Sequence, residues 1–197
     1  MSRAASSTGA PGRRRGDAER NVERILDAAI ELLAVQPTAS MAEVARASGL
    51  VRATVYGHFP RREALIDAIT DRAVADARSA FDEARLGEGT ATDAVARLAD
   101  AAWSVASRYM IVSEATLRTL GVARFRARRE VLRTEVRALV ARGRAAGEFR
   151  DDALLEWTAQ VFDSLLFGTY FTVEAGDLPA ADAADELARA FLAVLRR

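Results

Sequence analysis

The chain has 197 residues, half of them hydrophobic, with 28 basic residues that are all arginine and 28 acidic residues. This composition excludes a disordered chain, and the lack of cysteine excludes disulfides, thiolate metal sites and cysteine nucleophiles. Because no long uncharged apolar run is present, we expect neither a membrane span nor a secretory signal, no membrane partner, and a cytoplasmic location.

The charge is unevenly distributed along the chain. The segment up to Arg62 holds ten arginines and six acidic residues, a net charge of +4, so the remainder carries −4. A basic N-terminal segment followed by an acidic remainder is typical of a DNA-binding protein with a separate regulatory domain. Charge also fluctuates by a few units along any chain, so this asymmetry alone decides little.

The N-terminal residues 1–16 are Ser, Gly, Ala, Pro and Arg without periodicity, which predicts a disordered basic tail. Its arginines at 13–15 are either idle in solvent or placed along DNA phosphates. From Ala18 onward apolar residues recur with helical spacing. The first helix should end near Val35, because Pro37 disfavours helical geometry in the residue before it.

A second, short helix is predicted to start at Ser40. Ser40 and Glu43 fit the capping box, in which the serine side chain and the glutamate side chain each bond the other residue's backbone amide. Gly49 then supplies a residue that can take a positive φ and turn the chain sharply. Val55 and Phe59 form the inner face of a third helix. The pattern is that of a helix-turn-helix, in which the last helix enters the major groove of DNA.

A fourth helix is predicted from Arg62 to about Arg85. Further helical segments follow at about 90–107, 109–120, 125–146, 152–173 and 180–196. Strand patterns are missing, so the predicted fold class is all-α. The predicted domains are the tail at 1–16, a three-helix DNA-binding domain at 17–62, and a helical effector-binding and dimerisation domain at 63–197.

The run Glu43-Val-Ala-Arg-Ala-Ser-Gly-Leu-Val-Arg-Ala-Thr-Val-Tyr-Gly-His-Phe59, followed by Pro60-Arg-Arg-Glu-Ala-Leu65, carries a family signature. It closely resembles the N-terminal region of the tetracycline-repressor (TetR-like) regulators, over about residues 19–69. The resemblance implies a DNA-binding transcription regulator, in most cases a repressor that a small molecule releases from a palindromic operator.

The resemblance also implies which residues meet double-stranded DNA. Hydroxyl and imidazole groups and the Arg62 guanidinium would contact phosphates, Arg52 and Ala53 would face base edges, and Gly57 would allow close approach. The implied DNA-binding residues are Ser40, Arg52, Ala53, Thr54, Tyr56, Gly57, His58 and Arg62. Outside this spacing, Tyr56 would more often be a half-buried aromatic and His58 a surface histidine.

One position departs from the family pattern. The family usually has serine or threonine before the recognition helix, and this chain has Val51. Valine is a poor N-cap, so we expect the helix to be looser without DNA and Val51→Ser to raise thermal stability.

For the body of the protein, the resemblance implies a homodimer with a cavity for an unknown effector. An aromatic-rich lining would favour a hydrophobic effector, although the same residues fit an ordinary core. The candidate effector-binding residues are Trp103, Tyr109, Met110, Phe125, Trp157, Phe162 and Phe167. The candidate dimer residues are Leu165, Leu187, Phe191, Val194 and Leu195. Burial within one chain explains these five equally well.

Two other functions compete with this interpretation. An enzyme is disfavoured because His58 is the only histidine and lies in the predicted recognition helix, so no catalytic residue, metal site or cofactor is predicted. A DNA-binding regulator controlled by a protein partner, instead of a small ligand, is the alternative that the sequence leaves open.

Overall fold

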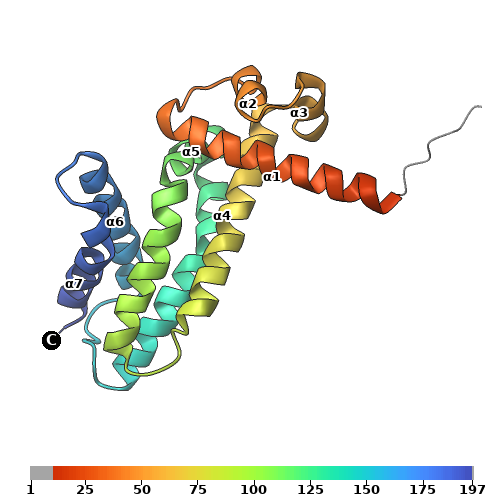
Figure 1. The fold of residues 1–197 in the computed structure, drawn as a ribbon. Helices are drawn as coiled ribbons and strands as arrows, with labels where there is room; N and C mark the ends of the chain where they lie inside the picture. The colour runs from red at the N-terminus through yellow and green to blue at the C-terminus, as the bar shows by residue number, and fades with distance from the viewer. Residues whose placement is uncertain (1–10, 197) are drawn as a thin grey trace, which may run out of the picture. The chain divides into compact units, whose positions relative to one another are not determined.

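The computed structural model describes the backbone of residues 11–196, without the side chains of residues 11–15, 111, 113–120, 122, 124–126 and 128. Every regular element in this range is helical, which confirms the predicted all-α fold (Figure 1). The chain divides into two compact units, one up to Ala68 and one from Ile69 onward. The boundary lies within helix α4 (Arg62–Ala84), a little further along the chain than the sequence suggested.

Unit 1 is built from α1 (Pro11–Val35), α2 (Met41–Ala47), α3 (Arg52–His58) and the beginning of α4. Helix α2 packs on α1, and α3 packs on α2. The apolar spacing predicted for the first helix is confirmed, because its inner side chains are buried. The core of this unit includes Ile25, Leu26, Ala29, Leu33, Val44, Val55, Phe59, Leu65 and Ile66.

Helix α1 begins earlier than expected. The sequence predicted a disordered tail up to residue 16, but residues 11–16 are helical. Pro11 stands at the first helical position, where its missing N–H would have no partner in the helix anyway. Residues 1–10, the rest of the predicted tail, lie outside the described residues, as do the side chains of the arginines at 13–15.

Unit 2 contains the rest of α4, then α5 (Ala91–Ala145), α6 (Leu155–Glu174), a 3₁₀ turn η1 (Ala180–Asp182) and α7 (Ala183–Leu195). Gly121 has φ 81° and ψ 166°, which are not helical values, and it divides α5 into two arms. Figure 1 shows the second arm running back beside the first. The predicted interruption near residue 108 is wrong, because the first arm is continuous up to Gly121.

Two side chains tie the ends of the α5 arms together. Arg142, in the second arm, donates to the carbonyls of Leu86 and Gly89, both at 2.8 Å, in the segment that leads into the first arm. The Glu148 carboxylate accepts from the backbone N–H groups of Ala91 at 2.9 Å and Thr92 at 2.8 Å. Glu148 therefore caps α5 from the other end of the hairpin.

The core of unit 2 lies between α4, both arms of α5, α6 and α7. It includes Phe81, Val95, Leu98, Val136, Leu139, Val140, Phe149, Phe162, Leu166, Leu187, Phe191 and Leu195. Phe149 lies directly against Gly143, where a Cβ atom would come within 2.1 Å of the ring. Among the described residues, no helix is long and apolar enough to span a bilayer.

Replacing Glu148 by Gln should lower the free energy of unfolding at pH 7, because one amide oxygen must replace two carboxylate oxygens. The hydrogen bonds from Ala91 and Thr92 lower the pKa of Glu148. The folded protein therefore holds the carboxylate charged at a pH where the unfolded chain is protonated. Its stabilisation is present above the unfolded value of about 4.3 and is lost as pH falls through the folded pKa.

Urea denaturation at pH 7 and at about pH 3 measures this effect. The difference between wild type and Glu148→Gln should shrink at the lower pH. A difference of the same size at both values would contradict the assignment.

Candidate functional site

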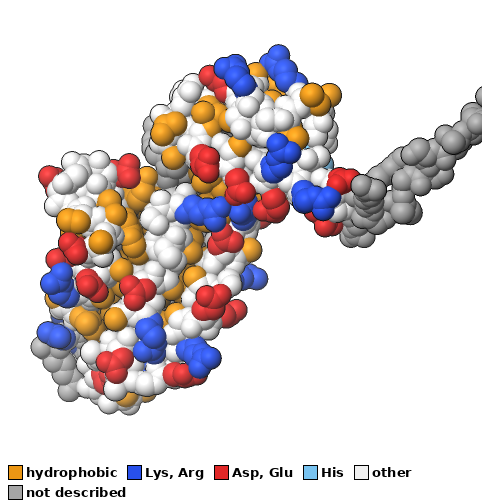
Figure 2. Space-filling model, viewed as in Figure 1, with side chains coloured by type: hydrophobic (Ala, Val, Ile, Leu, Met, Phe, Trp, Pro, Cys, Tyr) orange, Lys and Arg blue, Asp and Glu red, His pale blue; other side chains and the backbone are white. Residues whose placement is uncertain are grey.

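Helix α3 presents one exposed face. Arg52, Ala53, Tyr56 and Gly57 are exposed and recur at the spacing that places them on one side of a helix. On the opposite side Val55 is completely buried. The exposed surface that carries α2 and α3 also shows arginine side chains (Figure 2). Arg52 makes this face cationic, and its exposed residues are accessible to a partner.

The turn before α3 is fixed by backbone geometry. Gly49 has φ 65°, in the left-handed region that favours glycine, and it reverses the chain between α2 and α3. Arg24 of α1 donates from Nη2 to the carbonyl of Ser48 at 3.0 Å. The predicted glycine turn is confirmed, whereas the arginine that holds it had no local signal in the sequence.

The predicted capping box at the start of α2 is present. The Ser40 hydroxyl accepts from the Glu43 N–H at 3.3 Å, and the Glu43 carboxylate accepts from the Ser40 N–H at 2.7 Å. These backbone and side-chain hydrogen bonds from Ser40 lower the pKa of Glu43. Ser40 is exposed, but its hydroxyl already serves the fold.

Arg62 has a role that the sequence did not indicate. Its guanidinium donates to the carbonyl of Ala39, and to that of Pro37 at 2.7 Å, in the loop before α2. The resemblance implied a phosphate contact for this residue, and the structure shows a loop anchor. Thr54 and His58, the other implied phosphate contacts, are half-buried beside the exposed face of α3.

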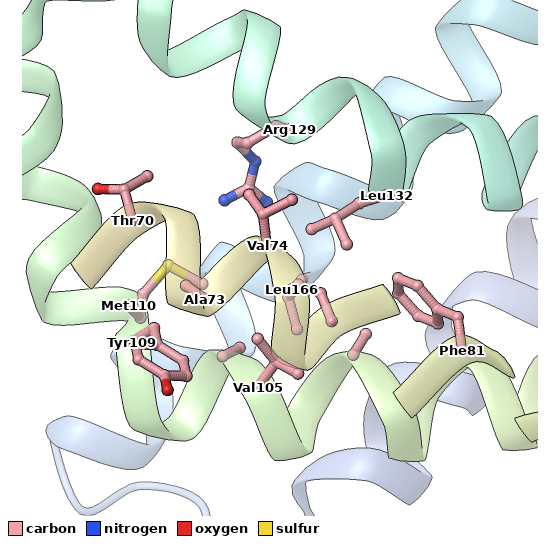
Figure 3. A pocket seen from close by; sticks show the side chains of 13 residues that line it. Thr70, Ala73, Val74, Phe81, Val105, Tyr109, Met110, Arg129, Leu132 and Leu166 are labelled. Atoms are coloured by element: carbon pink, nitrogen blue, oxygen red, sulfur yellow. The ribbon is translucent and has the colours of Figure 1, made fainter. Parts of the chain in front are cut away.

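A cavity of about 80 Å³ lies inside unit 2. Figure 3 shows side chains from α4, both arms of α5 and α6 around it. Most of its walls are apolar. The lining residues are Thr70, Ala73, Val74, Ala77, Phe81, Ala102, Val105, Ala106, Tyr109, Met110, Arg129, Leu132 and Leu166.

Besides the Thr70 hydroxyl, polar groups occur at two places in the cavity wall. The Tyr109 hydroxyl donates to Asp76 at 2.5 Å, and burial together with this hydrogen bond raises the pKa of Tyr109 to about 12. Arg129 is the one charged residue among the described lining residues. It pairs with buried Asp163 at 3.2 Å and lies over the ring of Phe167, 4.7 Å from its centre. Arg133 donates to the other Asp163 oxygen at 2.9 Å.

The predicted effector-binding residues divide into four groups. Tyr109 and Met110 line the cavity. Three others, Trp103, Phe162 and Phe167, belong to the packed core or its edge. Trp157 is 62% exposed and does not belong to the lining of this cavity. The side chain of Phe125 lies outside the described residues.

Most of the predicted dimer residues face inward. Leu187, Phe191 and Leu195 are at most 1% exposed, so they have no free surface for a second subunit and this assignment is wrong. The apolar seam of α7 is buried against α6 instead, where the Phe162 and Phe191 rings meet edge to face at 4.9 Å. Leu165 and Val194 are half-buried.

Among the residues of unit 2 whose side chains the structure describes, the large exposed apolar ones lie on α6 and just before it. Leu154, Trp157 and Phe171 are 79%, 62% and 59% exposed. Their spacing places them along one side of the helix, where Gly168 is also exposed. Hydrophobic side chains that interrupt the charged surface are visible in Figure 2. The sequence pointed to α6 but did not show which of its apolar faces is free.

A helix-turn-helix unit with an exposed helix that begins with an arginine, joined to a larger all-helical unit, is typical of DNA-binding transcription regulators. Residues 25–69 match the model of the family described as bacterial regulatory proteins, tetR family. The N-terminal region of this chain therefore carries the sequence pattern of the tetR family.

Individual relatives agree with this assignment. The chain is 43% identical over 54 residues to the HTH-type transcriptional repressor LfrR of Mycolicibacterium smegmatis, a match that covers 27% of this chain and 29% of LfrR. The solved structure of LfrR from Mycobacterium smegmatis in complex with proflavine has a TM-score of 0.74 at 22% identity and covers 88% of this chain and 94% of that one. A tetR-family regulatory protein from Rhodococcus RHA1 has a TM-score of 0.77 at 19% identity, covering 89% and 97%. The whole chain thus has the fold of tetR-family regulators.

Proposed function

We propose that this chain is a transcription regulator that binds double-stranded DNA through α3 and acts as a repressor. The observation that carries the proposal is the exposed face of α3, formed by Arg52, Ala53, Tyr56 and Gly57 around a buried Val55. The family match over residues 25–69 supports it.

The chemistry of this face fits the two kinds of contact that DNA offers. Arg52, at the first position of α3, has the length and the paired donors to meet guanine O6 and N7, a contact worth about 1–3 kcal/mol against a wrong base. The Tyr56 hydroxyl can donate to a phosphate oxygen. A Cβ atom at Gly57 would meet nothing within 4 Å, so the space beside it is open to the DNA backbone.

Selection of bound sequences from random duplexes tests DNA recognition. The wild type should recover a palindromic site, and Arg52→Ala should relax the preference at one base pair of each half-site. Arg61→Ala is the matched control, because Arg61 is exposed but lies outside α3. It should at most weaken binding to all sequences alike. Recovery of no preferred site by the wild type would contradict the proposed function.

We also propose that the regulator is a homodimer that uses the exposed side of α6. A short helix reads only a few base pairs, and two subunits related by a two-fold axis read a palindrome. Leu154, Trp157 and Phe171 form an apolar stripe that a second copy could cover. Isolated exposed apolar residues are ordinary, but a stripe of three along one helix favours a protein contact.

Replacing Trp157 by Glu should convert the dimer into a monomer, because a charge would be buried in the apolar interface. Val35→Glu is the control, since Val35 is 82% exposed and belongs to unit 1, whereas α6 belongs to unit 2. Sedimentation velocity of both variants measures the change. A dimer in the Trp157→Glu variant would show that another surface joins the subunits.

We further propose that an apolar effector enters the cavity of unit 2 and releases the DNA. The solved LfrR structure contains proflavine, which supports ligand binding in this fold. The cavity, at about 80 Å³, is smaller than the roughly 300–1,000 Å³ of drug-sized sites, so a ligand must push its walls apart. Five of its lining residues belong to α4, from Thr70 to Phe81, and α4 begins in unit 1. A ligand that favours a different position of α4 would shift the population away from the DNA-binding state.

Replacing Ala73 by Phe should fill part of the cavity and weaken effector binding by tenfold or more, about 1.4 kcal/mol. Ala75→Phe is the matched control, because Ala75 is on the same helix but exposed. Proflavine is the first probe, with fluorescence titration and release from the selected operator as readouts. Equal weakening by both changes, or binding without any change in operator affinity, would contradict the cavity proposal.

A further inference from the structure

The side chain of Val51, directly before α3, is largely exposed and makes no capping hydrogen bond. The residue is 70% exposed and has extended backbone angles of φ −67° and ψ 143°. Its carbonyl starts the helix by accepting from the N–H groups of Thr54 at 2.9 Å and Val55 at 3.3 Å. Any residue could supply that carbonyl, so the two methyl groups contribute nothing to the start of the helix.

Helix α2 shows how a polar residue at the N-cap position starts a helix in this protein. Helix α2 begins with a complete capping box formed by Ser40 and Glu43. A polar N-cap stabilises a helix relative to an apolar residue, and an exposed valine forgoes this gain. The methyl groups of Val51 therefore stand in solvent at a position where serine would be more stable.

The place of Val51 suggests a reason. In a helix-turn-helix, the residues at the N-terminal end of the recognition helix contact base edges in the major groove. Val51 is followed by Arg52 and Ala53, both exposed, so an apolar side chain stands beside the proposed guanine reader. Valine has no donor or acceptor in its side chain. The C5-methyl of thymine is the apolar group that a base pair presents in the major groove.

We propose that Val51 is a specificity-determining residue, which packs its methyl groups against the C5-methyl of a thymine in each half-site. This inference rests on the proposed DNA-binding function and assigns one further base of the operator. The contact is made by side-chain methyl groups and not by the amides at the helix end. Burying one methyl group corresponds to an affinity gain of about fourfold.

The test uses the full-length protein and the operator selected from random duplexes. Each thymine of a half-site is replaced in turn, symmetrically in both half-sites, by deoxyuridine, which differs only by the missing methyl group. Affinity is measured by fluorescence anisotropy at one fixed salt concentration. The wild type should lose about fourfold per missing methyl group at one position, close to the base pair whose preference depends on Arg52.

Two variants separate the methyl contact from the stability of the helix. Val51→Ser supplies a cap and removes both methyl groups, so its melting temperature should rise by about 2–4 °C while thymine and deoxyuridine become equivalent. Val51→Thr supplies a cap and keeps one methyl group, so it should still prefer thymine. A more stable protein with less discrimination cannot be explained by poor folding.

The outcomes are distinct. If deoxyuridine has no effect at any position in the wild type, or if Val51→Ser still prefers thymine at the same position, the inference is overturned while DNA recognition stands. If the wild type selects no sequence at all, the proposed function fails and this inference fails with it.

Discussion

Helix α4 belongs to both hydrophobic cores of the molecule, and the proposed coupling of the two units depends on this constraint. Leu65 and Ile66 are buried in unit 1, whereas Ala77 and Phe81 are buried in unit 2 and line the cavity. Between them α4 is one uninterrupted helix. Because packed cores resist gradual deformation, a change in the cavity wall has to be taken up by movement of the helix or by repacking of its neighbours. Arg62, at the start of α4, donates to two carbonyls of the loop before α2, so the proposed coupling would reach that loop through this side chain.

Helix α3 differs from α4, because little of its surface is buried. Val55 and Phe59 fix α3 to unit 1, and the rest of its surface is left for a partner. Its position depends on the Gly49 turn and on the bond from Arg24 to the Ser48 carbonyl. A short helix without a side-chain cap gains little stability of its own. The affinity of the protein for DNA therefore depends on the packing beneath α3 as well as on the residues that face outward.

Local patterns in the sequence predicted the helices and the turn of the first third of the chain. They did not predict contacts between residues that are far apart in the sequence. The Ser40–Glu43 capping box and the Gly49 turn are set by residues a few positions apart, so spacing alone identifies them. Arg129 and Asp163 lie 34 residues apart, and nothing distinguishes Arg129 from the 27 other arginines before folding brings the pair together. Helix α6 is apolar on several sides, so the sequence could not tell that Trp157 faces solvent. The sequence could not place Leu187 and Phe191 of α7 either. An apolar helix face has the same spacing whether it packs inside one chain or against a second subunit, and here both side chains are buried inside the chain.

The cavity in unit 2 has a consequence for the lifetime of the protein in the cell. Side chains around an apolar cavity make fewer packing contacts than those of a filled core, which lowers the free energy of unfolding. A molecule that occupies it restores part of this stability and adds a term that grows with its concentration. Chains without ligand then unfold more often and are exposed more often to proteases. An effector of this regulator would thus change how many copies persist as well as how tightly each one binds DNA.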